Sequence, residues 1–425
     1  MKVLIVNSFH YLRGGDCVYS FALAHLLRSR GHEVHFFGMK HPRNFPCDDE
    51  QFFVSHIDFQ ELNRKKSLLN IGRVLYRSIY STEARIKVGK LLDTIRPDVV
   101  HVQNIHGHLT PSILFEFEKR QIPVFWTLHD YKLICPNTHL LSNGEICEAC
   151  RGGKFYHCAL KKCKKNSRGA SVVASLEAMV HEYFRVTEKV WQFISPSRFL
   201  IDKFAEFGWP RERIAHVPNF LSLEKFTTQK ENDAGFVLYV GQLEPWKGLR
   251  TLLKACSALP DISFRIVGDG SHRALLEEAA RSDGVVNASF EGYLAGEALI
   301  DLQRSCSLVV APSECYENYP YAVMEAMALG KPVIASRLGG LPELVQDELT
   351  GYLFEARDYR ELSEKIRLLA SDRHLRAQFG SRARERALKE FDAASHYKGL
   401  MDVYNGAGSK VSLKTHRPHI PEGVG

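Results

Sequence analysis

Apolar residues in the first part of the chain form short runs that alternate with stretches of helical period. A β-branched apolar run covers residues 2–7, a stretch with helical spacing covers 18–30, and a second apolar run covers 33–37. Short continuous runs are typical of strands buried on both faces, and their alternation with helices predicts a parallel sheet. Further runs of this kind lie at 98–103, 123–129 and 192–197.

The same alternation starts again at residue 236 and predicts a second doubly wound α/β domain. Its expected strands lie in the runs at 236–243, 263–270, 306–313, 332–337 and 351–356. The helical stretches between and after them cover 249–259, 274–281, 321–329 and 360–370.

The expected domain organisation follows from the gap between the two series. Residues 209–226 carry two prolines and little periodicity, so we place a boundary at residue 211. The expected units are an N-terminal domain (1–211), a C-terminal domain (212–385), a charged helix (386–405) and a disordered tail (406–425).

Composition narrows the class of protein. A chain of 425 residues with 45% hydrophobic and 25% charged residues is globular, which excludes a disordered chain, a collagen and a simple coiled coil. The net charge of +7 does not indicate nucleic-acid binding, and none is expected. The N-terminal apolar run is too short for a signal peptide, and no apolar run is long enough for a membrane span, so a cytoplasmic chain is expected.

Two glycines open the first expected helix. Gly14 and Gly15 directly follow the first strand and its loop, so their N–H groups either form an anion site at the helix N-terminus or belong to a plain tight turn. A dinucleotide-binding fingerprint is absent, because no third glycine follows in the early helix and residues 35–38 offer no acid for a ribose. The pattern therefore disfavours NAD.

Two acids frame the start of the expected helix at 321–329. Glu325 is the single charged residue of that apolar stretch, and Glu317 precedes it by eight residues in the loop before the helix. A carboxylate in an apolar setting needs a hydrogen-bonding partner, and a ligand hydroxyl is one. The alternative is a helix-capping acid plus a glutamate satisfied within the protein. We favour the ligand interpretation.

Several segments in order then show a specific resemblance. The region from Glu317 through EAMALGKPVIASRLGGLPELV to TGYLF resembles the donor-binding region of retaining GT-B glycosyltransferases of the family 4, or group 1, type. Other segments agree along residues 2 to about 370: the Gly14–Gly15 loop, TLHD at 127–130, FISPSRF at 193–199, VPN at 217–219, VGQLEPWKG at 240–248 and VGDG at 267–270.

The resemblance implies a fold, a donor and a set of roles. Two Rossmann-like domains would face each other across a cleft, with acceptor binding by the first, nucleotide-sugar binding by the second, and the last helix returning to the first. The donor would be a nucleoside-diphosphate sugar. Lys247 would contact its diphosphate, Glu325 its ribose and Glu317 the transferred sugar, while His129 would lie at the sugar–acceptor junction. The backbone of Gly339, Gly340 and Leu341 would lie against sugar and phosphates, opposite Gly14 and Gly15.

This sequence departs from the family pattern at two places. Gln242 stands where relatives commonly carry the arginine of the phosphate clamp, and Arg337 and Arg250 are the candidates to replace that cation. Loss of one cation weakens leaving-group stabilisation by a few kcal/mol if nothing replaces it. The first loop continues with Asp16 and Cys17 where many relatives have Ala and Glu, which leaves an acidic contact there in doubt.

A cysteine-rich insertion at about 135–163 follows TLHD. Cys147 and Cys150 are spaced like a metal-binding pair, whereas the spacing of Cys158 and Cys163 is looser than that of a standard zinc finger. A structural zinc knuckle and free thiols in a lid near the acceptor are the two interpretations. No metal or other cofactor is expected for catalysis itself, because Lys247 and helix N-termini supply positive charge.

Two basic stretches lie in the first domain. Residues 151–168 contain seven Lys and Arg and no acid, and a second stretch between Arg64 and Lys87 mixes basic with apolar residues. They predict either solvated helix faces or contact with an anionic membrane or a polyprenyl-diphosphate acceptor, which would place the chain at the inner face of a membrane.

The combined expectation is retaining transfer of a sugar to a saccharide or lipid-linked acceptor, in cell-surface polysaccharide synthesis. Two alternatives remain. A sugar-nucleotide epimerase of the same fold would need acid and base residues around the sugar. A degraded homologue that binds sugar nucleotides or acts as a scaffold is conceivable because of Gln242.

Overall fold

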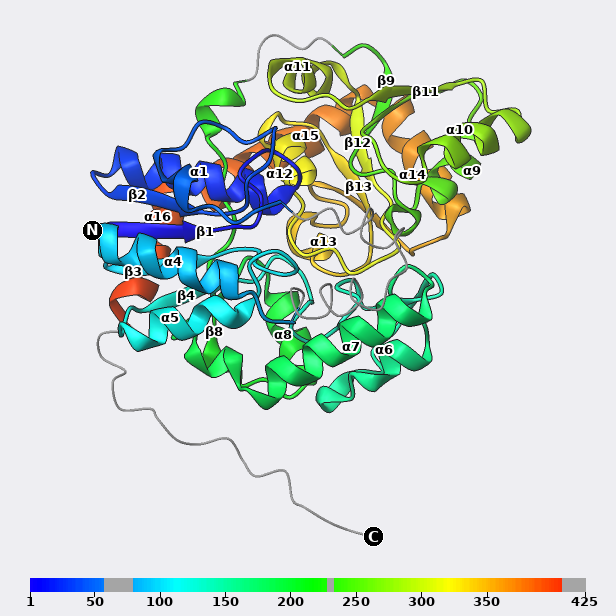
Figure 1. The fold of residues 1–425 in the computed structure, drawn as a ribbon. Coiled ribbons are helices and arrows are strands. Elements are labelled where there is room, and N and C mark those ends of the chain that lie inside the picture. The colour runs from blue at the N-terminus through cyan, green and yellow to red at the C-terminus, as the bar shows by residue number, and fades with distance from the viewer. Residues whose placement is uncertain (57–78, 228–232, 407–425) are drawn as a thin grey trace.

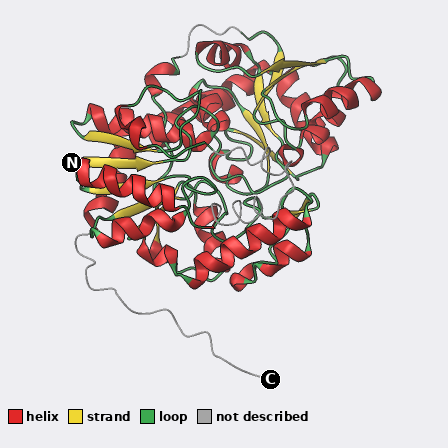
Figure 2. Ribbon diagram, in the orientation of Figure 1, coloured by secondary structure: helices red, strands yellow, loops and turns green. Residues whose placement is uncertain are grey.

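The computed structural model describes residues 1–56, 79–227 and 233–406, arranged as two α/β domains that meet along a common face (Figure 1). The expected tail and the basic residues Arg64 to Arg77 lie outside the described residues. Figure 2 shows that in each domain the strands form a central layer with helices on both sides.

The first domain is built on a parallel sheet with the strand order β2-β1-β3-β4-β7-β8 among the described residues. Its strands are β1 (Lys2–Val6), β2 (Glu33–Phe37), β3 (Val99–Val102), β4 (Val124–Thr127), β7 (Gln192–Ser195) and β8 (Ile214–His216). Its helices are α1 (Gly15–Ser29), α4 (Thr82–Ile95), α5 (Leu114–Lys119), α6 (Tyr156–Leu160), α7 (Arg168–Tyr183) and α8 (Arg198–Glu206). The insertion adds the small hairpin β5 (Leu141–Ser142) and β6 (Glu145–Ile146).

The second domain repeats this plan, with the parallel strand order β11-β10-β9-β12-β13-β14. Its strands are β9 (Phe236–Val240), β10 (Ser263–Val267), β11 (Ala288–Gly292), β12 (Leu308–Ala311), β13 (Val333–Ser336) and β14 (Gly351–Phe354). Its helices are α9 (Leu249–Ala258), α10 (Arg273–Ser282), α11 (Glu297–Ser305), α12 (Tyr321–Ala328), α13 (Leu341–Leu344), α14 (Tyr359–Ser371) and α15 (Arg373–Glu390).

Burial explains why the apolar runs became strands. Residues 3–6 of β1 are fully buried, because helices cover both faces of the sheet that contains β1. Serine and aspartate side chains start several helices: the Ser197 hydroxyl accepts a hydrogen bond from Leu200 N at the start of α8, and Asp372 accepts one from Leu375 N at the start of α15. The predicted doubly wound parallel architecture is confirmed.

The first sheet extends beyond the boundary expected at residue 211. β8 pairs in parallel with β7, from Phe193 opposite Ile214 to Ser195 opposite His216. Residues 214–216 therefore belong to the first sheet, and we propose to place the boundary between His216 and Phe236.

The C-terminal helix α16 (Ala393–Gly406) returns to the first domain, as the fold expectation required. The Tyr404 hydroxyl lies 2.7 Å from Nδ1 of the buried His101, and His396 Nε2 lies 3.2 Å from the Tyr19 hydroxyl. The chain thus crosses between the domains twice. The two crossings touch, because Leu221 N donates a hydrogen bond of 3.0 Å to Phe391 O.

Candidate functional site

The N-termini of two helices from different domains lie beside each other. Gly15 is the first residue of α1, and a Cβ atom built on it would lie 3.5 Å from Cδ2 of Tyr321, the first residue of α12. The free N–H groups of a helix N-terminus attract negative charge. Gly14 and Gly15 of the first domain are therefore placed against the start of α12, as an anion-binding arrangement requires.

An ion pair links the loop at 241–248, where a phosphate clamp was expected, to the loop before α12. Lys247 Nζ lies 2.6 Å from Glu317 Oε1, and the Ser313 hydroxyl donates a hydrogen bond of 2.5 Å to the same oxygen. Burial alone would raise the pKa of Glu317, but the Lys247 ammonium and these hydrogen bonds hold that pKa below its usual value. The pKa of Lys247 is raised, because attraction to Glu317 outweighs the effect of burial. Both groups are thus charged at neutral pH.

The segment 339–341 passes directly against the backbone of this loop. Gly340 N donates a hydrogen bond of 2.7 Å to Glu317 O. A Cβ atom on Gly340 would lie 1.9 Å from Asn318 O, and one on Gly339, whose φ is 66°, would lie 2.5 Å from Glu317 N and O. Only glycine permits so close an approach. Leu341 follows as the fully buried first residue of α13.

A group of buried polar atoms without full hydrogen bonding lies farther along α12. Glu325 Oε2 accepts a hydrogen bond of 3.3 Å from Gln303 Nε2, and burial raises the pKa of Glu325 to about 7. Among the described residues, Gln303 Oε1 and the Tyr321 hydroxyl have no hydrogen-bond partner. Tyr321 and Glu325 are four residues apart and share one helix face. Ligand hydroxyls are suitable partners for such atoms.

His129 is held neutral at the end of β4. Its Nε2–H donates to Gln103 Oε1 at 2.7 Å, and burial lowers the pKa of His129 to about 4. Its ring packs edge-on against Tyr19, with centroids 5.4 Å apart. Asp130 accepts a hydrogen bond of 2.8 Å from Lys132 N and thereby caps the turn that follows His129.

Asn318 joins the loop of Glu317 to the strand end that carries His129. Its Nδ2 donates a hydrogen bond of 3.0 Å to Leu128 O, and its Oδ1 accepts one of 2.6 Å from the Ser197 hydroxyl. The structure thus brings Glu317, Lys247 and the Gly339–Gly340 backbone into direct contact. Gly15 lies against the first residue of α12, and Glu325 belongs to that helix, which follows the loop of Glu317. His129 is linked to the same loop through its neighbour Leu128, which Asn318 contacts.

Several residues at this site were not predicted from the sequence. Ser313 and Gln303 contact the predicted site residues Glu317 and Glu325, and Asn318 contacts Leu128 beside His129, but no role was predicted for any of the three. The stack between His139 of the insertion and Trp246 of the loop before α9 was not predicted either; the ring centroids lie 4.5 Å apart. The contacts of Asn318 and His139 depend on how the two domains meet, and those of Ser313 and Gln303 on packing within the second domain; no local pattern encodes either.

The structure argues against one of the two candidates to replace the missing clamp arginine. Arg337 forms ion pairs with Asp347 at 2.7 Å and Glu355 at 3.2 Å, so its guanidinium is already neutralised. Arg250 lies exposed on α9, and the Gln242 side chain is exposed as well. Lys247 is therefore the cation that the site residues contact directly.

The five cysteines of the insertion gather in one region of the first core. Cys135, Cys150 and Cys158 are buried, Cys163 packs beside them, and Cys147 is partly exposed. Within the described ranges, no group of three or more His, Cys, Asp or Glu residues has the arrangement of a metal site. A zinc site in the insertion stays a prediction.

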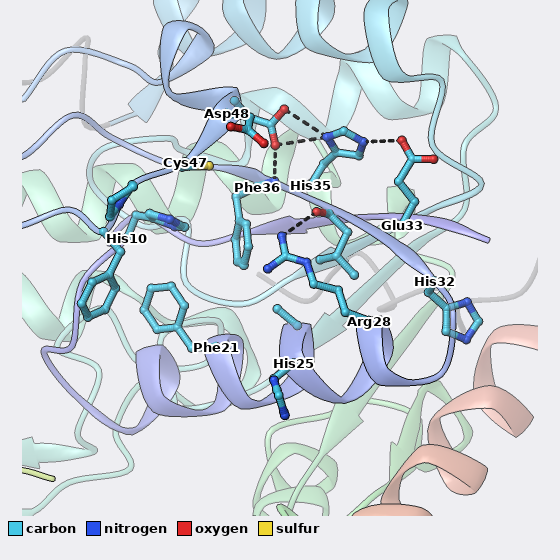
Figure 3. Close-up of a pocket in the computed structure, with 15 residues that line it drawn as sticks. His10, Phe21, His25, Arg28, His32, Glu33, His35, Phe36, Cys47 and Asp48 are labelled. Atoms are coloured by element: carbon cyan, nitrogen blue, oxygen red, sulfur yellow. Dashed lines mark hydrogen bonds and ion pairs between the residues drawn. The ribbon is translucent and has the colours of Figure 1, made fainter.

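A larger cavity, of about 810 Å³, lies apart from the predicted site (Figure 3). It runs between α1, β2 and residues 45–49, and Figure 3 shows Arg28 of α1 reaching across it. Several of its polar groups are already engaged: Arg28 donates to Val34 O at 2.9 Å, and His35 lies between Asp49 and Glu33, at 3.0 Å from each. None of the predicted site residues lines this cavity.

Family models match the chain on both sides of the domain boundary. The Glycosyltransferase Family 4 model matches residues 13–225, which is half of the chain, and the model of Glycosyl transferases group 1 matches residues 222–386. With the paired α/β domains and the site between them, these matches define the class. The chain belongs to the group 1, family 4 type of glycosyltransferases.

Curated relatives are similar to this chain over less than half of its length. The chain is 34% identical over 180 residues to the sulfoquinovosyl transferase of Arabidopsis thaliana, covering 42% of this chain and 34% of that protein. It is 30% identical over 190 residues to the glycogen synthase of Mycobacterium tuberculosis, covering 44% of this chain and 45% of that protein. The matches thus also span less than half of these relatives' own length.

Solved structures confirm the GT-B fold over nearly the whole chain. The sucrose-phosphate synthase of Thermosynechococcus elongatus has a TM-score of 0.71 at 18% identity, covering 96% of this chain and 99% of that chain. The HepE protein of Anabaena, solved in complex with UDP-glucose, has a TM-score of 0.68 at 18% identity, covering 96% and 100%.

Proposed function

We propose that this chain transfers a sugar from a nucleoside-diphosphate donor to a saccharide or lipid-linked acceptor, with retention and without a catalytic metal. The observation that carries the proposal is the contact of Lys247, Glu317 and the Gly339–Gly340 backbone beside two helix N-termini. Positive groups and close backbone suit a diphosphate, and the unsatisfied polar atoms around Glu325 suit ribose hydroxyls. The printed titles of the HepE structures, which name UDP and UDP-glucose, agree with such a donor.

The residues divide the chemical work between the phosphates and the sugar. The acceptor hydroxyl attacks the anomeric carbon, the bond from that carbon to the diphosphate breaks, and its electron pair leaves on the phosphate oxygen. Lys247 and the N-termini of α1 and α12 stabilise that developing negative charge. The released phosphate oxygen takes the acceptor's proton, so a protein base is not required.

Retention is part of the proposal because the leaving phosphate takes the acceptor's proton, which requires the acceptor to attack from the face that the diphosphate leaves. Glu317 is held where it can assist either face. Its Oε1 is engaged by Lys247 at 2.6 Å and by Ser313 at 2.5 Å, which keeps the carboxylate ionised and fixed. A fixed anion stabilises positive charge that develops on the sugar. His129 is neutral and hydrogen-bonded to Gln103, which suits a group that positions a sugar hydroxyl.

A donor panel tests the proposal. Unfolding temperature is measured for the full chain with UDP-, GDP- and ADP-sugars, and donor hydrolysis and transfer are measured with the donors that shift it. One donor class is expected to stabilise the wild type, since a ligand at 100 times its Kd adds about 2.7 kcal/mol. Glu325→Ala is expected to lose that shift, whereas Glu278→Ala, which removes an exposed acid of α10, keeps it.

The anomeric configuration of the product is read by NMR and is expected to match that of the donor. An absence of any shift across the panel, together with equal hydrolysis by wild type and Glu325→Ala, would refute the transfer activity. An inverted product would refute retention alone.

A further inference from the structure

Helix α7 exposes a stripe of large apolar side chains. Val172, Leu176, Met179 and Tyr183 have 44%, 42%, 46% and 82% of their surface exposed. Their spacing of four, three and four residues places them on one face of the helix. We call these four residues the α7 stripe.

The α7 stripe is not the face by which the helix packs into the domain. On the other side, Ser175 donates a hydrogen bond of 2.9 Å to Phe155 O, and the buried Glu177 pairs with Lys132 at 2.9 Å. Ala174 belongs to the first core. The helix already has its packing partner, so the α7 stripe is a second apolar face. Contiguous exposed apolar surface of this kind marks an interaction site.

Large apolar side chains are also exposed on α6 and directly after α7. Leu160 and Tyr156 of α6 are 70% and 48% exposed, and Phe184, just after α7, is 56% exposed. Figure 1 shows α6 and α7 side by side on the outer edge of the first domain, and the two helices are in contact. Both helices of this pair therefore expose large apolar side chains, and Tyr183 and Phe184 at the end of α7 are aromatic, a type enriched at membrane–water interfaces.

Basic residues precede α7 in the chain or begin it, in the segment that contains α6, and we call the exposed ones the basic border. Between Glu148 and Glu177 the chain contains seven Lys and Arg and no acid. Lys154, Lys161, Lys165 and Arg168 are exposed, and none of them forms an ion pair with another described residue. By contrast, Arg85 and Lys87 of the other basic stretch pair with Glu116 and Glu83. Unpaired cations around an apolar stripe complement an anionic lipid surface, where each contributes to binding.

A second copy of this chain fits the surface less well. A two-fold interface brings the same patch of both subunits together, so the basic border of one copy would face the basic border of the other. Repulsion between like charges would oppose that contact.

We propose that the α7 stripe and its basic border dock this chain on an anionic phospholipid bilayer. In this arrangement α7 lies in the plane of the lipid headgroups, with the stripe toward the acyl chains and the lysines beside the phosphates. The cysteine-rich insertion, which contacts the loop before α9 through His139 and Trp246, contains α6. The proposal goes beyond the transfer reaction and stands without it, because vesicle binding needs no donor.

Flotation of the full chain with vesicles of phosphatidylcholine, with and without 30% phosphatidylglycerol, tests the proposal. The wild type is expected to float with the anionic vesicles and to remain behind with the neutral ones. Leu176→Ser with Met179→Ser should lower the partition coefficient at least tenfold. Lys161→Gln with Lys165→Gln should lower it more than tenfold, at roughly fivefold per lysine, and added salt should mimic that loss. Leu275→Ser with Val286→Ser removes two exposed apolar residues of the second domain and should leave flotation unchanged.

Circular dichroism confirms that each variant is folded, and light scattering reports the oligomeric state. The proposal fails if anionic vesicles do not capture the wild type, or if the control pair weakens flotation as much as the stripe pair. It also fails if the stripe pair converts a dimer to a monomer while lipid binding is absent, since the stripe would then be an interface between copies.

Discussion

Lys247 and Glu317 hold each other charged in a largely buried setting, so removing either one leaves the other without its counter-ion. Lys247→Met should lower kcat/KM for donor turnover by about 10²–10³, the usual loss for one group that stabilises transition-state charge. It should also reduce the free energy of unfolding by about 1–3 kcal/mol, because Glu317 loses a charged hydrogen bond. Steady-state kinetics and urea unfolding measure the two effects.

Lys189→Met is the matched control for that substitution. Lys189 pairs with Glu118 at 2.6 Å in the first domain, away from the site, and 54% of the Glu118 side chain is exposed, so water solvates that carboxylate when Lys189 is removed. Its loss should change stability by less than about 1 kcal/mol and leave kcat/KM unchanged. Unchanged turnover in Lys247→Met would contradict the role assigned to the ion pair.

Glu325 gives the protein a pH dependence of predictable sign. Its pKa is raised by burial from 4.5 to about 7, so the folded protein holds this proton more tightly than the unfolded chain. The stabilising contribution is complete below about pH 4.5 and is lost as pH rises through 7. The Glu325→Gln variant lacks that loss. Relative to it, the wild type should become less stable by on the order of 3 kcal/mol between pH 4.5 and 8.

Urea unfolding of both proteins across this pH range isolates the contribution, since the other titrating groups are shared. A constant difference in stability between pH 4.5 and 8 would show that the Glu325 carboxyl titrates normally. Donor affinity adds a second readout. Ribose hydroxyls donate best to the ionised carboxylate, so wild-type affinity should increase from pH 6 to 8 while that of Glu325→Gln stays flat.

At the scale of elements, the close approach of two loops depends on a glycine, which has no side chain. Gly340 has an ordinary φ of −82°, so the obstacle to alanine there is steric: its Cβ would lie 1.9 Å from Asn318 O. Gly340→Ala should push the start of α13 away from the loop of Glu317. We expect weaker donor binding and a loss of stability of about 1–3 kcal/mol, measured by calorimetry and urea unfolding.

Gly169→Ala provides the comparison. Gly169 lies in α7, and a Cβ atom added to it would meet nothing within 4 Å, so alanine there should stabilise the helix by about 0.5–1 kcal/mol. If Gly340→Ala behaved in the same way, the close packing of segment 339–341 would not matter for the site.

Two of the strands that sequence reasoning missed share a physical property. β8 and β11 are edge strands, each paired with a neighbour on one side. β11 has no fully buried residue, and β8 has three residues of which Ile214 alone is buried. Such strands lack the continuous apolar run by which the inner strands were predicted, because half of their surroundings is solvent or helix ends.

At the scale of the whole molecule, a carboxylate of the second domain caps a helix of the first. Glu343 of α13 accepts hydrogen bonds from Phe199 N and, at 2.9 Å, from Arg198 N, both at the start of α8. Glu343→Ala should let the domains separate more often, because these N–H groups then bond to water. We expect a larger radius of gyration by small-angle X-ray scattering and a several-fold higher KM.

Glu361→Ala separates this effect from the loss of any carboxylate–backbone bond. Glu361 accepts a hydrogen bond of 2.7 Å from Glu355 N within the second domain. Its removal should leave the radius of gyration unchanged. Equal expansion in both variants would show that the contact of Glu343 with α8 does not hold the domains together.

Only the site residues that belong to recognisable motifs could be predicted from the sequence. Glu317, Glu325 and Lys247 belong to segments that resemble the family in order and spacing; the structure brings Lys247 into contact with Glu317 and places Glu325 on α12, the helix that follows Glu317. Gln303, by contrast, reaches Glu325 from a helix with no motif, and Asn318 reaches Leu128 across the domain boundary. Such contacts arise from the packing of whole domains, and the sequence positions involved are 22 and 190 residues apart.

The double crossing of the chain has a mechanical consequence. Because Leu221 N bonds to Phe391 O and His396 Nδ1 lies 2.7 Å from Pro218 O, the two crossing segments are tied together as one hinge. A hinge made of two joined chain segments resists twisting but allows bending. The domains can then rock about a single axis while they keep their alignment. Motion is then largest at the far rim, where Arg357 pairs with Glu145 at 2.5 Å and His139 stacks on Trp246. Release of product would require those rim contacts to break while the hinge stays intact.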